Sequence, residues 1–276
     1  MKRDHSDDVA GGTGPVEERP RRWRRLWVVA AVIVVLLGLL VGGAELFLRA
    51  IIPNVIAGVV RDKIGLSQQH EVDVQLQGSA LIPALGGHVG SVDLRIPDLE
   101  VVDGITADVS AHADSIPFDP TKGRIEGATA TATISSDSVG PLLALVTDGV
   151  VDDGTVKDGL LEVSKTLQLF GYDVQLSAEF GLSVQDGNLV VDPSSINAAG
   201  FNLTAEQLRP LLGDNASALL DTRSVCLRDR LPEGVTLTDI ELRQGVLGGS
   251  AAVTAKFDPE LLSNPTKQQF GSCEAS

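Results

Sequence analysis

The feature that most constrains this chain is an uninterrupted apolar run over residues 26–44, LWVVAAVIVVLLGLLVGGA, which holds no charged and no strongly polar side chain. As an α-helix, its 19 residues reach about 28 Å, close to the thickness of a bilayer's hydrocarbon core. A buried helix of a globular protein normally keeps a polar face over this length. The run therefore predicts a single transmembrane helix.

The residues before the run predict its orientation. They include a cluster of arginines: Arg19, Arg21, Arg22, Arg24 and Arg25. Such a cluster stays cytoplasmic, and Trp23 and Trp27 lie where an interfacial aromatic belt is expected. We therefore expect residues 1–25 to be a disordered cytoplasmic tail and residues 45–276 to lie outside the cell membrane.

Cleavage of this segment is an alternative. Gly42 and Ala44 are small residues placed like the −3 and −1 positions of a signal-peptidase site. The apolar run is longer than the usual apolar region of a signal peptide, however, and 25 residues precede it. We therefore expect an uncleaved single-pass anchor.

The charge of the remaining chain excludes several partners. After residue 25 there are 15 basic and 32 acidic residues, a net charge of −17. Such a domain is repelled by nucleic-acid phosphates and by anionic lipid surfaces. Any contact with lipid must therefore be apolar. Aromatic residues make up only 4% of the chain, so the core must consist of Val, Leu, Ile and Ala.

The two cysteines, Cys226 and Cys273, both follow the membrane segment. In an oxidising compartment an even pair indicates a disulfide. Closing this loop of 47 residues stabilises the fold by about 4 kcal/mol in the chain-entropy model. The bond would tie the polar tail, residues 259–276, back onto the body. Two free thiols or a metal site are weaker alternatives, because no His or further Cys lies nearby in sequence.

Residues 45–64 continue with helical spacing and carry two neighbouring apolar ridges. One ridge is Phe47, Ile51, Val55 and Val59, and the other is Leu48, Ile52, Ile56 and Val60. We expect this wide stripe to lie against a sheet. Pro53 predicts a kink or a fresh start of the helix, and Gly65 is a plausible C-terminal cap.

The spacing of apolar residues then changes to two, which is typical of strands with one buried face. It predicts strands over residues 71–77, 92–96, 105–112, 161–169, 172–185, 188–191, 235–242 and 246–257. Asp186-Gly187 predicts a two-residue hairpin turn, and a phase slip near Thr238 predicts a bulge. Strands this long suggest one extended, strongly curved antiparallel sheet, whose apolar face would form a trough.

Three short apolar segments interrupt the strands. Residues 138–147 and 204–212 predict helices, the second opened by a capping-box pattern of Thr204 and Gln207. Residues 81–85 predict an apolar loop or short helix between glycines. Apolar residues beside loops indicate a contact surface.

The chain lacks the patterns of known catalytic and metal sites. It contains no zinc-protease His-Glu-x-x-His, no nucleophile elbow and no phosphate-binding loop, and its four histidines have no metal-ligand spacing. The aspartates between 148 and 158 match no calcium-loop order, so a solvated acidic loop is expected there. We therefore expect no catalytic residue, no metal and no cofactor, and a hydrolase or transferase is the least supported class.

Three stretches carry a family resemblance: LLEV at 160–163 followed by GYDV at 171–174, VQDGNLVV at 184–191, and LPEGVTLTDI at 231–240. These stretches and their order make the chain from about Glu45 to Phe257 similar to the LmeA-like phospholipid-binding family of actinobacterial envelopes, so we expect residues 45–258 to form a lipid-binding-like ectodomain. That resemblance implies an α+β fold like the tubular lipid-binding proteins, with a long N-terminal helix packed on a strongly curved antiparallel sheet. It also implies phospholipid binding and a role in envelope lipid handling or assembly, and it supplies no catalytic residues.

We therefore predict a membrane-anchored protein that holds phospholipid acyl chains in its apolar trough. The expected trough residues are Val174, Ala178 and Leu182. The expected mouth is formed by Leu81, Ile82, Leu85, Leu142, Leu143, Leu211 and Leu212. The alternative is a non-enzymatic structural or partner-binding accessory protein of an envelope complex, which would bury the same apolar face in its own core. The sequence identifies no protein partner.

Overall fold

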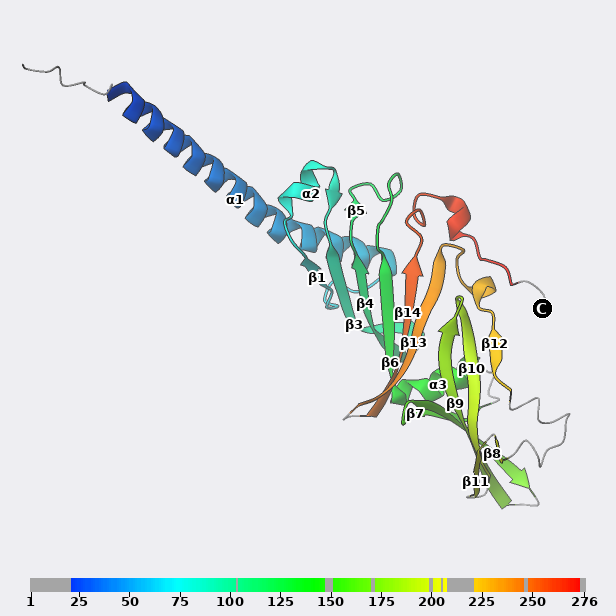
Figure 1. The fold of residues 1–276 in the computed structure, drawn as a ribbon. Coiled ribbons are helices and arrows are strands. Elements are labelled where there is room, and N and C mark those ends of the chain that lie inside the picture. Colours follow the sequence, from blue (N-terminus) through cyan, green and yellow to red (C-terminus); the bar gives the residue numbers. More distant parts are fainter. Residues whose placement is uncertain are drawn as a thin grey trace, which may run out of the picture. The chain divides into compact units, whose positions relative to one another are not determined.

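The structure, a computed structural model, divides into two compact units, Met1–Leu46 and Phe47–Ser276, and we call the second the sheet domain (Figure 1). The residues that it describes are 21–102, 104–146, 151–169, 172–198, 201–204, 206–207, 221–245 and 248–273.

Helix α1 runs from Arg21 to Ile64 without interruption. Within α1, Ala31–Ile64 is the one helical stretch among the described residues that is long and apolar enough to cross a membrane, and none of its most apolar window is buried. Its length and composition fit either a membrane span or a signal sequence. The predicted fresh start at Pro53 is not observed, because the helix continues through this residue. The predicted cap is confirmed: Gly65 has φ 78°, and the Leu66 amide donates to the Arg61 carbonyl at 2.8 Å, as in a Schellman motif.

The larger sheet is antiparallel and has the strand order β1-β3-β4-β6-β14-β13. Its strands are β1 (Asp73–Leu76), β3 (Val92–Val102), β4 (Ile105–Ala113), β6 (Thr129–Ser135), β13 (Val235–Gly245) and β14 (Gly248–Phe257). The register between β13 and β14 shifts between Leu237 and Asp239, which confirms the predicted bulge near Thr238.

A second antiparallel sheet has the order β11-β10-β9-β8-β7, with β12 paired to β10. Its strands are β7 (Asp153–Lys157), β8 (Leu160–Leu169), β9 (Tyr172–Gln185), β10 (Asn188–Ala198), β11 (Phe201–Thr204) and β12 (Arg223–Val225). Asp186 and Gly187 have φ 52° and 77°, as the predicted hairpin turn requires. A separate pair joins β2 (His88–Val89) to β5 (Ile116–Pro117).

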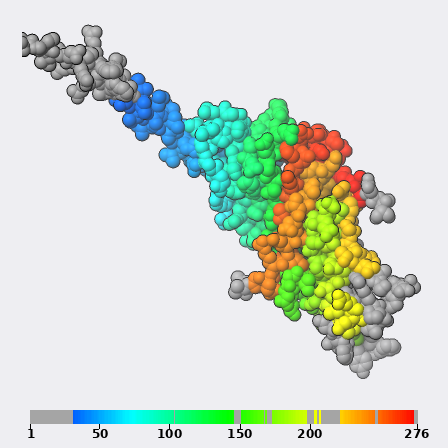
Figure 2. Space-filling view, in the orientation of Figure 1, coloured from blue at the N-terminus to red at the C-terminus, as the bar shows by residue number. Residues whose placement is uncertain are grey.

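The prediction of one extended sheet is therefore wrong. The chain leaves the larger sheet after β6, builds β7–β11 as consecutive antiparallel neighbours, and returns only with β13 and β14. In the second sheet, β7 to β11 each pair with the strand next to them in the chain, whereas in the larger sheet β14 pairs with β6 across more than a hundred residues. The two sheets still touch, because β13 contacts both β9 and β7 (Figure 2).

The short helices are α2 (Leu81–Leu85), α3 (Ser136–Val146), and the 3-10 turns η2 (Arg228–Arg230) and η3 (Pro265–Gln268). Residues 81–85 are thus helical, and the predicted helix at 138–147 begins two residues earlier. The capping box is also present: the Thr204 amide donates to Gln207 Oε1 at 3.0 Å, and the Gln207 amide donates to Thr204 Oγ1 at 3.3 Å. Most of the helix predicted after it lies outside the described residues.

One of the two predicted ridges of α1 packs on the larger sheet. Ile52, Ile56 and Val60 contact a core built from Ala57 of the helix and Val72, Val74, Val89, Val92 and Ile96 of the strands and loops. The other ridge is exposed, with Phe47 at 64% and Val55 at 57%. The expectation that both ridges lie against the sheet is therefore wrong, because a straight helix turns only one side toward a single sheet.

The predicted disulfide between Cys226 and Cys273 is present, with the Cα atoms 6.0 Å apart. Backbone hydrogen bonds continue the attachment, since Gly271 donates to Leu231 and Glu233 donates to Gln269. The C-terminal tail is thus held along the segment that leads into β13.

Candidate functional site

The side of the larger sheet that α1 packs on is apolar throughout, and we call it the inner face. Strand register assigns to it Val92, Leu94, Ile96, Val109, Ala111, Ala130, Ala132, Ile134, Ala251, Val253, Ala255, Leu237, Ile240 and Leu242. Charged residues such as Asp93, Asp108, Glu241 and Lys256 alternate with these and point to the opposite face.

Burial of the inner face is uneven. Beneath α1, Val92 is only 3% exposed and Ile96 only 1%. Across β4, β6 and β14, Val109, Ala132 and Val253 stay half-buried, although the face is just as apolar there. Ala107 of β4 and Ala251 of β14 are buried. Close-packed interiors leave few gaps larger than a water molecule. A half-buried apolar surface of this extent inside a domain is therefore a candidate binding surface.

Small side chains dominate this uncovered part. Ala111, Ala130, Ala132 and Ala255 lie on adjacent strands, paired directly across β4, β6 and β14. Alanines in a core position leave depth above the sheet that larger side chains would fill. These residues were not predicted as part of the site, although the alternation TATATI at 129–134 is typical of a strand with an alanine face.

Helix α3 closes one end of the inner face. Val139 of α3, Val156 of β7 and Ala251 of β14 form a buried cluster, with Leu143, Leu161, Ile134 and Leu242 packed against it. Leu161 pairs with Phe180, so this cluster also reaches the apolar face of the second sheet. The apolar faces of the two sheets thus meet under α3.

The predicted trough residues lie on that second apolar face. Val174, Ala178 and Leu182 are on the same side of β9 and are all half-buried. On β8, Val163 pairs with Ala178, and on β10, Val191 pairs with Leu182. The alternation predicted for β9 is therefore present, and its apolar side is only partly covered.

The predicted mouth is split by the structure. Leu81, Ile82 and Leu85 form α2 beside the end of the larger sheet where Leu76 pairs with Val92. Leu142 and Leu143 belong to α3, which follows Ser135 at the opposite end of β6 (Figure 1). The two groups thus lie at opposite ends of the inner face. Leu211 and Leu212 lie outside the described residues.

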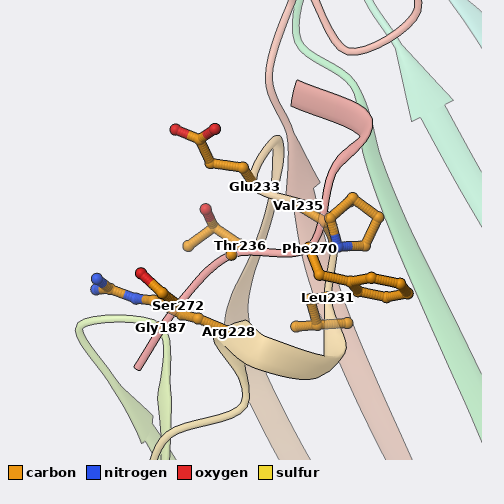
Figure 3. A pocket seen from close by; sticks show the side chains of 10 residues that line it. Gly187, Arg228, Leu231, Glu233, Val235, Thr236, Phe270 and Ser272 are labelled. Atoms are coloured by element: carbon orange, nitrogen blue, oxygen red, sulfur yellow. The ribbon is translucent and has the colours of Figure 1, made fainter. Parts of the chain in front are cut away.

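A cavity lies elsewhere in the sheet domain, beside the disulfide-bonded tail (Figure 3). It has a volume of about 500 Å³ and lies among Gly187, Arg228, Leu231, Pro232, Glu233, Val235, Thr236, Phe270, Gly271 and Ser272. Arg228 donates to the Asp186 carbonyl at 3.2 Å, and Phe270 leaves most of its ring exposed. The cavity was not predicted from the sequence, where the cysteine pair that holds the tail is its only signal.

A polar cluster lies on the opposite face of the larger sheet, which we call the outer face. His112 Nδ1 is 2.7 Å from Asp93 Oδ1, and His112 Nε2 is 3.2 Å from Asp114 Oδ1. The hydrogen bond to Asp93, and to a smaller extent the one to Asp114, raises the pKa of His112. The hydrogen bond from Gln77, and to a smaller extent the one from His112, lowers the pKa of Asp93. Among the described residues, no group of three or more His, Cys, Asp or Glu side chains is placed to hold a metal ion.

A family model, LmeA-like phospholipid-binding, matches residues 43–251. The chain belongs to the LmeA-like phospholipid-binding family. The match spans every strand of the inner face up to Ala251, and it leaves out the tail that carries Cys273. LmeA-like proteins are a lipid-binding family and not an enzyme family. No curated protein and no solved structure matches the chain.

Proposed function

We propose that the sheet domain holds the acyl chains of a phospholipid against the uncovered inner face, between α1 and α3. The observation that carries this proposal is the half-buried, alanine-rich floor formed by β4, β6 and β14. Membership of a phospholipid-binding family supports it independently. Curvature of the twisted sheet would turn this floor into a trough for the chains.

The energetics favour such a ligand. Each CH₂ group moved out of water contributes about 0.8 kcal/mol, so a dozen buried methylenes hold a lipid firmly. Val174, Ala178 and Leu182 of β9 would extend the apolar surface beyond the floor. Leu142 and Leu143 would border its α3 end, and Leu81, Ile82 and Leu85 its α2 end. Leu211 and Leu212 remain proposed contacts from outside the described residues.

The head group would receive weak polar contacts. Residues 26–276 have a net charge of −17, so few cations are free to bind a phosphate. The sheet domain would lie outside the cell membrane, anchored by α1, with residues 1–25 in the cytoplasm. The disulfide supports this placement, since such bonds persist in oxidising compartments. The biological role would be the handling or assembly of envelope lipids, without catalysis.

A second candidate function is an accessory of an envelope protein complex. The exposed ridge of α1 favours it, because Phe47, Ile51, Val55 and Val59 lie on one side of the helix and are not covered by the sheet. A partner helix packed on that ridge would bury it without any lipid. The two candidates differ in whether the purified protein carries lipid on the inner face.

Native mass spectrometry of the full chain, followed by solvent extraction, tests the lipid-binding proposal. We expect one phospholipid that survives activation sufficient to strip the detergent and the lipids around α1. A matched pair of variants locates it: Ala132→Phe fills the floor, whereas Thr133→Phe adds a similar bulk to the outer face of the same strand. Loss of the retained lipid only in Ala132→Phe supports the site. Equal lipid in all three proteins, or none in the wild type, rejects it.

A further inference from the structure

Three large apolar side chains protrude at the end of the sheet domain that holds α2, and we call them the apolar tip. Ile82 is 73% exposed, Leu85 is 82% exposed and Phe118 is 59% exposed. The Phe118 amide donates to the Gly87 carbonyl at 3.1 Å, and β2 pairs with β5 just beside it. Phe118 therefore lies next to α2, although more than thirty residues separate them in the chain.

The tip is held in place by the fold and does not contribute to its core. Ala80 before α2 and Val89 after it are both buried. The turn between them is closed locally, since Gly86 donates to the Pro83 carbonyl at 2.9 Å and Gly87 to the Ala84 carbonyl at 3.1 Å. Exposure of large apolar side chains to water is unfavourable, so a partner surface that covers this turn would stabilise it.

The position of the tip in the chain indicates what covers it. Arg49 donates a hydrogen bond from its guanidinium to the carbonyl of Gly78, which precedes α2 by three residues. Arg49 follows Ala44, the last residue of the apolar run, by only five residues. Even fully extended, five residues reach only about 17 Å. The end of the sheet domain that carries α2 is therefore tethered close to the membrane that the run would span.

The charges around the tip fit an apolar contact. On the loop after Phe118, Lys122 pairs with Asp119 at 2.8 Å, and Arg124 pairs with Glu260 at 3.3 Å. Each of these two cations has a carboxylate partner, so neither pair adds a net charge that would attract or repel lipid phosphates. Contact through Ile82, Leu85 and Phe118 would therefore be governed by apolar burial and would not need anionic lipid.

We propose that the apolar tip inserts into the outer leaflet of the same membrane that α1 spans, so that the α2 end of the inner face opens toward the lipids. This docking rests on α1 being a retained span. Docking would bring the edge of the sheet where Leu76 pairs with Val92 to the membrane surface. A lipid would enter the proposed site at this edge.

The test uses the full chain in vesicles of neutral phosphatidylcholine, with an environment-sensitive fluorophore on one introduced cysteine per variant. The reporter positions are Leu85→Cys and Phe118→Cys at the tip, Val34→Cys in α1, and Asp158→Cys at the β7–β8 turn. The native cysteines are bonded to each other, so the introduced thiol is labelled selectively. Each variant must keep the wild-type melting temperature to be used.

Phospholipids brominated on their acyl chains should quench the reporters at 34, 85 and 118 at least twofold and leave the reporter at 158 unchanged. Quenching at 34 without quenching at 85 and 118 would overturn the docking and leave lipid binding to the inner face untouched. No quenching at 34 would overturn the span and the docking together. Equal quenching at 158 would show unspecific adsorption and also overturn the proposal.

Discussion

Gly249 in β14 lies directly against the carbonyl group of Val156 in β7: a Cβ atom on Gly249 would be 2.3 Å from that oxygen. The two residues belong to different sheets. Only a residue without a side chain allows the two backbones to approach this closely. This contact lies where the inner face ends under α3, so it fixes one boundary of the proposed binding surface.

Substitution of Gly249 by alanine should therefore destabilise the sheet domain. The added methyl group meets backbone atoms, which cannot move aside cheaply, and we expect a loss of about 1–3 kcal/mol. Thermal unfolding followed by circular dichroism measures it. Gly58→Ala is the matched control: nothing lies within 4 Å of a Cβ there, and alanine favours the helix. A melting temperature for Gly249→Ala at or above that of the wild type would contradict the close contact.

Removal of the disulfide should loosen the C-terminal tail and lower stability. The double variant Cys226→Ser with Cys273→Ser loses a cross-link across 47 residues, and we expect a decrease of about 2–4 kcal/mol in the free energy of unfolding. Denaturant unfolding of both proteins gives the difference. Non-reducing peptide mapping of the wild type should recover the two cysteine peptides joined, and thiol labelling of the native protein would argue against the bond.

The interaction of His112 with Asp93 should make stability depend on pH. The pKa of His112 is raised above 6.5 in the folded state, so its contribution is complete below pH 6.5 and disappears as pH rises through the raised pKa. The pKa of Asp93 is lowered below 3.8, so its contribution is complete above pH 3.8 and disappears as pH falls through the lowered pKa. The pair therefore stabilises the fold most between these two values.

We expect His112→Gln to lower the melting temperature more at pH 5.5 than at pH 8. Both side chains are more than a third exposed, so solvent screening keeps the effect below about 1 kcal/mol. Adding Asp93→Asn completes a double-mutant cycle that isolates the pair from other titrating groups. An identical difference between wild type and His112→Gln at both pH values would mean that the pair does not contribute.

The strands could be predicted because their signals are local. The alternation in β9, the turn at Asp186-Gly187 and the slip near Thr238 depend on a few neighbouring residues, and each matches the structure. The family resemblance is also confirmed, over residues 43–251.

The division into two sheets could not be predicted, because pairing between Thr131 and Thr254 depends on contacts across more than a hundred residues. The same limit applies to the candidate site. The ends of the inner face at which α2 and α3 lie follow from strand directions in the folded sheet, so their separation could not be predicted from the sequence. The role of their leucines at a lipid site stays a prediction.

Photo-crosslinking shows directly whether acyl chains lie on the inner face. The full chain is placed in phosphatidylcholine vesicles that contain a trace of phosphatidylcholine with a diazirine at the end of one acyl chain, irradiated, digested and mapped by mass spectrometry. We predict crosslinks in β6 and β14, at or beside Ala132 and Val253, and their loss in Ala132→Phe. Crosslinks confined to α1 and the apolar tip, with none in β6 or β14 of the wild type, would contradict the binding of acyl chains on the inner face.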